Sequence, residues 1–405
     1  MKRKETRKIE RQYRKGEERL LGRIMIDLCA PVEDIDTHSK HKATEEGIAL
    51  CLSGGGYRAM LFHLGALWRL NELGILKKIA RISSVSGGSI VAGVLGMNWD
   101  KLDFDSSLFA QGFISQVVKP IRRLAEKTID IKAILEGLFT PGTINNRLIQ
   151  IYKKTLFGKT TLRDMPDDPP RFVINASNVQ SGALWRFMKP YMADWKVGRI
   201  NQPDIPLAVA VGASSAFPPF LSPVVLRLRI SDFAPNSGDG LQKEPFMSRV
   251  ILTDGGVYDN LGIETAWKRY RTVLVSDGGG QIEPEAKPRK NWISHLFRTF
   301  QIVNNQVRSL RKRQVIQSFK NGSRQGTYWG IQTDIADYDL TDALSYPHDK
   351  TMELARIRTR LKRLDPTLQE RLINWGYAVC DAAIRKHVDR GYEPPKSFPY
   401  PESNI

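Results

Sequence analysis

Three turns in this chain carry residue types that together can cleave an ester bond. The first contains three consecutive glycines, Gly54, Gly55 and Gly56, the second contains Ser86, and the third contains Asp254. A serine oxygen can attack an acyl carbon once a base removes its proton, and backbone N–H groups can stabilise the negative oxygen that forms. These residue types therefore predict a serine acyl hydrolase.

Each turn directly follows a short apolar segment that predicts a buried strand, at residues 48–52, 79–85 and 250–252. The first two turns lead into segments with helical spacing of apolar residues, at 58–73 and 87–97. A strand, a helix, a strand and a helix in succession predict a parallel sheet. Ligands bind to such sheets at the carboxyl ends of the strands, so we expect the three turns to share one edge.

Ser86 stands where a strand turns sharply into a helix, which strains the turn residue and makes its side chain project from the sheet. Close approach of strand and helix requires small residues two positions before and after, here Ser84 and Gly88. The usual G-x-S-x-G pattern has glycine at the earlier position, so the match is imperfect. The N–H of Gly87 lies at the helix start and can face an oxyanion. Taken alone, this sequence is equally typical of a plain loop.

The glycine run predicts consecutive N–H groups that converge on one anion, at the positive end of a helix. Two nucleotide-binding alternatives use similar turns. A P-loop needs Lys and Ser or Thr after the glycines, but Tyr57 and Arg58 follow here. A dinucleotide fingerprint is formally matched by Gly54, Gly56 and Ala59, yet the second strand does not end in the required acidic residue. An oxyanion hole is the better interpretation.

The base that activates the serine is usually a histidine. The six histidines are His38, His41, His63, His295, His348 and His387. None lies in a predicted strand-end turn, and His63 falls within the first helix, where a packing or capping role is expected. Asp254 acting directly as the base is simpler. Its competitor is Asp277, which follows the next predicted strand in a second Asp-Gly-Gly turn.

These motifs together resemble the patatin-like phospholipase family. That family carries an oxyanion glycine run followed by a basic residue, a serine elbow, and an Asp-Gly-Gly turn with a nearby Asn. Here the basic residue is Arg58, the serine is Ser86, and the last turn contains Asp254 with Asn260. The order and the wide spacing also match, over roughly residues 47–280.

Two further segments, 63–65 and 213–220, resemble the first-helix signature and the helix-to-loop segment of the family. The second of them lies upstream of Asp254, and Asn260 follows at the family spacing. Asp277 has no counterpart in the core motif, and its glycines lead into a proline-containing linker. We therefore expect Asp254, and not Asp277, to face the serine.

The resemblance implies an α/β fold, a three-layer sandwich with a mainly parallel central sheet flanked by helices. It also implies a Ser86–Asp254 dyad without histidine, which hydrolyses phospholipids or related acyl lipids through an acyl-serine intermediate and needs no metal or organic cofactor. The other implied site residues are four oxyanion-hole glycines and two supporting residues: Gly54, Gly55, Gly56 and Gly87, with Arg58 and Asn260.

Two residues depart from the family pattern. Ser84 replaces the first glycine of the elbow, and Ala59 replaces the glycine that often follows the basic residue. Both are small, so we expect distortion of the site and not its loss. The alternative function is a catalytically inactive membrane- or nucleotide-binding protein that holds a phosphate group in the glycine-rich turn.

The chain has 405 residues and a formal net charge of +18, which suits an anionic membrane surface, nucleic acid or simple solvation. It contains no nucleic-acid-binding motif. Its three cysteines are widely spaced, which fits a reducing compartment. No apolar segment is long enough for a membrane span or a signal peptide. We expect a cytoplasmic protein that is peripheral on a membrane; its oligomeric state is left open.

Three regions are expected along the chain. Residues 1–46 form a basic N-terminal arm, 47–335 the catalytic domain, and 336–405 a C-terminal helical section packed on that domain. Within the last region, apolar spacing predicts helices at 354–364 and 368–388.

Residues 286–333 contain ten Lys and Arg but no Asp or Glu, with apolar residues at helical spacing. An amphipathic basic helix of this kind can lie in an anionic membrane interface. The alternative, which we prefer from sequence, is a helix packed on the sheet with a solvated basic face.

Overall fold

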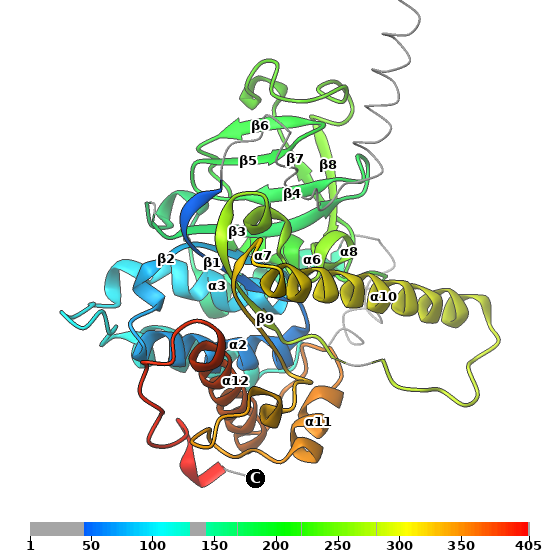
Figure 1. The fold of residues 1–405 in the computed structure, drawn as a ribbon. Coiled ribbons are helices and arrows are strands. Elements are labelled where there is room, and N and C mark those ends of the chain that lie inside the picture. Colours follow the sequence, from blue (N-terminus) through cyan, green and yellow to red (C-terminus); the bar gives the residue numbers. More distant parts are fainter. Residues whose placement is uncertain (1–43, 130–142, 168, 220, 281, 404–405) are drawn as a thin grey trace, which may run out of the picture.

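A computed structural model of the chain describes residues 44–129, 143–167, 169–219, 221–280 and 282–403 (Figure 1). The predicted N-terminal arm lies outside the described residues, apart from its last three positions.

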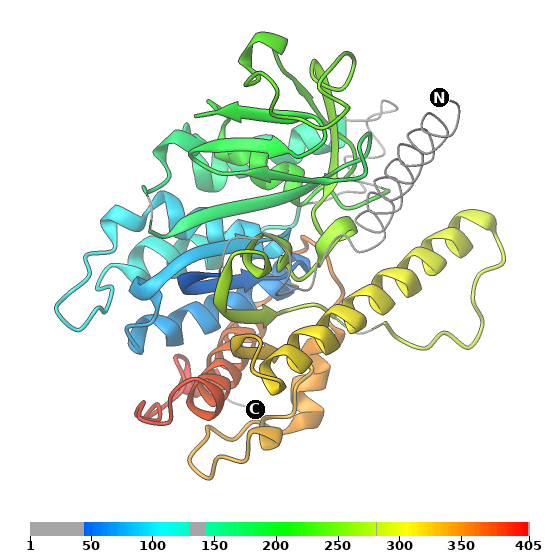
Figure 2. The same ribbon diagram turned by 45° about the horizontal axis from the view of Figure 1, so that its top comes forward.

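The centre of the fold is a parallel sheet, as predicted. Five strands lie side by side in the order β10 (Gln325–Gly330), β9 (Tyr270–Asp277), β1 (Glu45–Leu52), β2 (Ile79–Ser84) and β3 (Arg171–Asn178). Antiparallel strands extend the sheet beyond β3 (Figure 2). They are β4 (Leu184–Phe187), β5 (Tyr191–Asp194), β6 (Gly198–Asn201), β7 (Val224–Arg227) and β8 (Arg249–Asp254).

Helices cover both faces of this sheet. Along β1, Leu50 and Leu52 face one layer, and Ala49 and Cys51 face the other. The first layer contains α2 (Gly56–Glu72), α3 (Gly87–Met97) and α12 (Pro366–His387). The second contains α9 (Glu264–Trp267) and the C-terminal half of α10 (Trp292–Lys320). The alternation of side chains along the strand thus produces the predicted three-layer α/β fold.

The C-terminal section meets the rest of the fold where α12 crosses α2. Gly65 of α2 lies against the carbonyl of Ile373, and Gly376 of α12 lies against the carbonyl of Phe62. A Cβ atom at either glycine would collide with the opposite backbone. Because both glycines lack this atom, the two helices pack at very close range.

One predicted helix, at residues 354–364, is wrong beyond its start. Helix α11 (His348–Arg356) ends at Arg356, and Ile357 leaves the helical conformation with φ −55° and ψ 123°. The carbonyls of the following residues are used elsewhere: Arg58 donates to the Ile357 oxygen, and the Tyr57 N–H donates to the Arg360 oxygen at 3.2 Å. Contacts with α2 therefore replace the hydrogen bonds that would continue the helix.

The strand β3 pairs with two different strands along one edge. Its first half, residues 171–174, lies opposite β2, and its second half, residues 176–178, lies opposite β8. The other edge of β3 is occupied by β4, which pairs with residues 174–177. Because β2 runs parallel and β8 antiparallel to β3, they point toward each other, and their carboxyl ends meet.

Candidate active site

Ser86 lies between β2 and α3, at the point where β2 and β8 converge. Its backbone has φ 52° and ψ −118°, a region that L-residues rarely adopt and that costs free energy. Ser86 is partly exposed, whereas its neighbours Val85 and Gly87 are buried. The strained turn therefore presents one serine to the outside, as the elbow motif predicts.

A chain of buried hydroxyl groups holds this turn. The N–H of Ser86 donates to Ser214 Oγ at 3.0 Å, and Ser214 bonds to Ser89 at 2.9 Å. Ser89 in turn donates to Ser84 Oγ at 3.0 Å, and Ser84 donates to the Val173 carbonyl at 3.2 Å. Ser84, the departure from the family pattern, thus completes a network that ties the turn to β3. The sequence gives no local sign of this role, although Ser214 belongs to the segment 213–220 that resembles the family's helix-to-loop segment.

The glycine run lies directly beside Ser86. A Cβ atom built on Gly54 would be 3.3 Å from the Cβ of Ser86, and one on Gly87 would collide with the carbonyl oxygen of Gly56. Gly55 has φ 149° and Gly56 has φ 62°, conformations that favour glycine. The backbone fold of both turns therefore depends on their having no side chains.

Of the four predicted oxyanion donors, one is already engaged. The Gly54 N–H donates to the Asn260 carbonyl at 3.0 Å. The N–H groups of Gly55, Gly56 and Gly87 donate to no acceptor within the described parts of the chain. The last two also lie in the first turns of α2 and α3, where the helix dipole favours negative charge. Three of the four predicted donors are thus unengaged among the described residues.

Asp254 ends β8, and its side chain is 2% exposed. Its Oδ1 accepts a hydrogen bond from the Gly256 N–H at 2.7 Å. Burial raises the pKa of Asp254 to about 7, although the Gly256 N–H and the nearby Ser86 hydroxyl lower it. Its Oδ2 is buried and has no hydrogen-bond partner among the described residues. The Ser86 hydroxyl is thus close enough to lower the pKa of this carboxyl, but no hydrogen bond joins it to Asp254 Oδ2.

Asn260 connects the glycine turn with the aspartate turn. Its backbone oxygen accepts from Gly54, and its side-chain Oδ1 would lie 2.5 Å from a Cβ atom on either Gly54 or Gly256. The amide therefore fills the space between the two turns and fixes their separation. Its role is to position the backbone around Ser86 and Asp254.

Arg58 is bonded to groups other than the serine. Its side chain donates to the carbonyl of Gly278 at 3.1 Å, to the carbonyl of Ile357, and to Thr359 Oγ1 at 3.1 Å. Burial and the nearby Arg308 lower its pKa to about 10. Arg58 thus connects the start of α2 to the turn after β9 and to the segment after α11.

Asp277, the competing carboxylate, has other partners. Its Oδ2 lies 3.4 Å from Arg308 Nε and accepts from Tyr328 Oη at 2.8 Å, while its Oδ1 accepts from the Gly279 N–H at 2.9 Å. Burial raises the pKa of Asp277, but Arg308 and these two hydrogen bonds outweigh it, so the pKa is lowered. This carboxylate is a stably charged partner of α10 and of β10.

His63 lies close to the glycine turns, and both of its ring nitrogens are engaged. His63 Nδ1 lies 2.8 Å from Ser276 Oγ, and Nε2 lies 3.0 Å from the Ser53 carbonyl. Burial lowers the pKa of His63 to about 4, so the ring is neutral at physiological pH. Both nitrogens have partners other than Ser86, as expected for a histidine that serves packing.

The sequence of this chain matches the profile of one family, described as patatin-like phospholipase, over residues 50–267. Among solved structures, human GIVD cytosolic phospholipase A2 is 14% identical, with a TM-score of 0.36 over 59% of this chain and 47% of that one. VipD from Legionella pneumophila is 15% identical, with a TM-score of 0.31 over 84% of this chain and 66% of that one. The chain therefore spans about half the length of the human protein. A search of curated protein sequences gave no significant match.

Two further findings concern metal-binding groups and membrane-spanning helices. Within the described ranges, no three His, Cys, Asp or Glu side chains are grouped as a metal site would require. The helices in those ranges also include none that is long and apolar enough to cross a bilayer.

Proposed function

This chain belongs to the patatin-like phospholipase family, and on that basis we propose that it hydrolyses carboxylic esters of phospholipids or related acyl lipids through an acyl-Ser86 intermediate. One observation carries the proposal most. A buried carboxyl with a pKa of about 7, Asp254, lies beside the one partly exposed residue of a strained serine turn. A base works best when its pKa is close to the working pH, and Asp254 meets this condition without a histidine.

In the first step, Asp254 takes the proton from Ser86 Oγ, and the oxygen attacks the carbonyl carbon of the ester. The carbonyl oxygen becomes negative and accepts hydrogen bonds from the N–H groups of Gly55, Gly56 and Gly87. The intermediate then collapses, the bond to the alcohol breaks, and the protonated Asp254 gives its proton to the leaving alkoxide. An ester of Ser86 with the acyl chain remains.

In the second step, Asp254 takes a proton from a water molecule, which attacks the acyl carbon. The same N–H groups stabilise the second oxyanion. The bond to Ser86 Oγ breaks, the oxygen recovers its proton from Asp254, and a free fatty acid leaves. Each donor of an oxyanion hole contributes about 10²- to 10³-fold to the rate in comparable enzymes, so three unengaged donors are a large part of the catalytic effect.

The test compares fatty acid release from mixed phospholipid vesicles by three proteins: wild type, Ser86→Ala and Ser115→Ala. Ser115 is an exposed serine that bonds only to its own helical turn, so its variant controls for the loss of a hydroxyl group. We expect Ser86→Ala to abolish release and Ser115→Ala to leave it unchanged. Release by Ser86→Ala at the wild-type rate would refute the proposal. Saturable nucleotide binding without any hydrolysis would instead support a phosphate-binding role for the glycine turn.

A further inference from the structure

The N-terminal half of α10 extends away from the three layers. Both ribbon views show this half projecting from the side of the molecule, whereas its C-terminal half lies against the sheet (Figures 1 and 2). The buried residues of the helix are Arg311, Val315 and Ser318, all in the C-terminal half. The packed alternative drawn from the sequence therefore holds for the C-terminal half, and only the N-terminal half remains a candidate for a membrane contact.

An apolar stripe that the fold leaves uncovered begins on the projecting half and continues just past the middle of the helix. Trp292 is 74% exposed, Leu296 62% and Val303 52%, and Val307 and Leu310 continue the stripe at 40% and 52%. Their spacing of three, four and seven residues places all five on one side of the helix. Soluble surfaces rarely expose so many large apolar side chains together, and such a patch marks an interaction site.

The surroundings of this stripe are basic. Lys287, Arg289 and Lys290 are exposed just before the helix and have no acidic partner among the described residues. No Asp or Glu occurs between residues 286 and 333. Apolar side chains flanked by uncompensated cations suit an anionic lipid surface, where the chains enter the interface and the cations meet the headgroups. A second copy of this chain, or its own basic N-terminal residues, would add repulsion between like charges.

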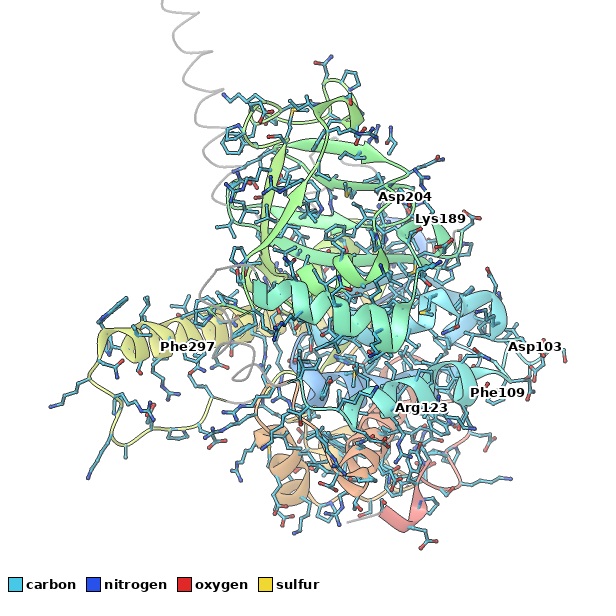
Figure 3. All side chains as sticks on the ribbon, turned by 180° about the vertical axis from the view of Figure 1, so that it is seen from behind. Asp103, Phe109, Arg123, Lys189, Asp204 and Phe297 are labelled. Atoms are coloured by element: carbon cyan, nitrogen blue, oxygen red, sulfur yellow. The ribbon has the colours of Figure 1, made fainter. Side chains whose placement is uncertain are left out.

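A neighbouring side of the same helix contacts the segment that precedes the proposed base. Phe297, labelled in Figure 3, and Phe300 contact the ring of Phe217 at centroid distances of 6.4 and 6.2 Å. The residue before Phe217 is Ala216, whose carbonyl accepts the backbone N–H of Asp254 at 3.0 Å. A lipid surface that contacts α10 would therefore lie next to the segment that holds the proposed base.

We propose that the projecting half of α10 is a docking element for an anionic phospholipid bilayer, in which Trp292, Leu296 and Val303 enter the interface beside the active site. The choice of a bilayer that contains the substrate rests on the proposed function. The binding itself does not depend on turnover, so it can be measured in a protein that carries Ser86→Ala.

The experiment is flotation of the Ser86→Ala protein with vesicles of phosphatidylcholine, with or without phosphatidylserine. The same protein carrying Trp292→Ser, Leu296→Ser and Val303→Ser is expected to bind the phosphatidylserine vesicles at least about tenfold more weakly. The matched control carries Val179→Ser and Ile230→Ser, which remove apolar side chains of 58% and 46% exposure elsewhere on the surface. It should bind like the parent.

Three results would overturn the proposal. They are no binding of the parent to the phosphatidylserine vesicles, equal binding by the triple variant, or a dimer of the parent in solution that the triple variant dissociates. An unchanged thermal unfolding midpoint of the triple variant shows that it is folded. Hydrolysis of a soluble short-chain ester by wild type, measured separately, distinguishes a failure of the docking proposal from a failure of the proposed function.

Discussion

Replacing Asp254 by asparagine should abolish catalysis and at the same time stabilise the protein at alkaline pH. The carboxyl has a pKa of about 7 in the folded protein, against an ordinary value of 3.8, because it is buried. At pH values between these two pKa values, Asp254 holds a proton in the folded protein that it releases in the unfolded chain. Stability therefore falls as the pH rises through this window, and above it the fold contains a buried charge that asparagine lacks.

The size of the effect follows from the pKa shift. A rise from 3.8 to about 7 is about three pH units, and at about 1.4 kcal/mol per unit it corresponds to about 4 kcal/mol of lost stability at full ionisation. Part of this loss is already present at about pH 5. The difference in the free energy of unfolding between Asp254→Asn and wild type should therefore grow by about 3 kcal/mol between about pH 5 and about pH 8. Asparagine keeps an oxygen for the Gly256 N–H, so this hydrogen bond is retained.

The assay is urea unfolding of wild type and Asp254→Asn at a series of pH values, followed by circular dichroism. Asp277→Asn is the matched control, because the stability that this carboxylate contributes depends on pH with the opposite sign. Arg308 and two hydrogen bonds keep the pKa of Asp277 low despite its burial, so its charge stabilises the fold at neutral pH, and this stabilisation disappears only as the pH falls through that low value. A stability difference for Asp254→Asn that does not change with pH, or that shrinks as the pH rises, would refute the reasoning.

Three further predictions concern the reaction. The kcat/KM for a soluble ester should fall about tenfold for each pH unit below a midpoint set by the Asp254 pKa, about 7; a flat pH–rate profile would contradict this. Gly87→Ala should lower kcat by about 10²- to 10³-fold, because the added methyl group collides with the Gly56 carbonyl and displaces the Gly87 N–H. A folded variant with wild-type kcat would exclude the Gly87 N–H as an oxyanion donor. His63→Gln should cost about 1–3 kcal/mol of stability in denaturant unfolding, because its bonds to Ser53 and Ser276 are buried. Its kcat should stay within about tenfold of wild type, and a larger fall would point to a catalytic histidine.

The residues of the candidate site could be proposed from sequence because each belongs to a local pattern. An apolar strand followed by a glycine turn indicates where a backbone leaves the sheet, and this pattern singled out Ser86 and Asp254 as candidates. How the two residues meet was not predictable. We expected three strand ends at one edge of a parallel sheet, but β8 is antiparallel and meets β2 end to end along β3. That arrangement depends on pairing between distant segments, which leaves no local signal.

Contacts between distant segments also explain the other differences. The helix predicted at 354–364 ends early because Arg58 and Tyr57, far away in sequence, bind the carbonyls that would continue it. The hydroxyl network of Ser84, Ser89 and Ser214 joins three elements, and an isolated serine in each gives no sign of it. Local propensity is a weak guide wherever tertiary hydrogen bonds compete with it.

The central claim, that Asp254 activates Ser86 directly, is tested most directly by peptide mass spectrometry after reaction with an alkyl fluorophosphonate. We expect one adduct, on Ser86, and a labelling rate that falls at least about 100-fold in Asp254→Asn. An adduct on another serine in place of Ser86, or labelling of Asp254→Asn at the wild-type rate, would contradict it.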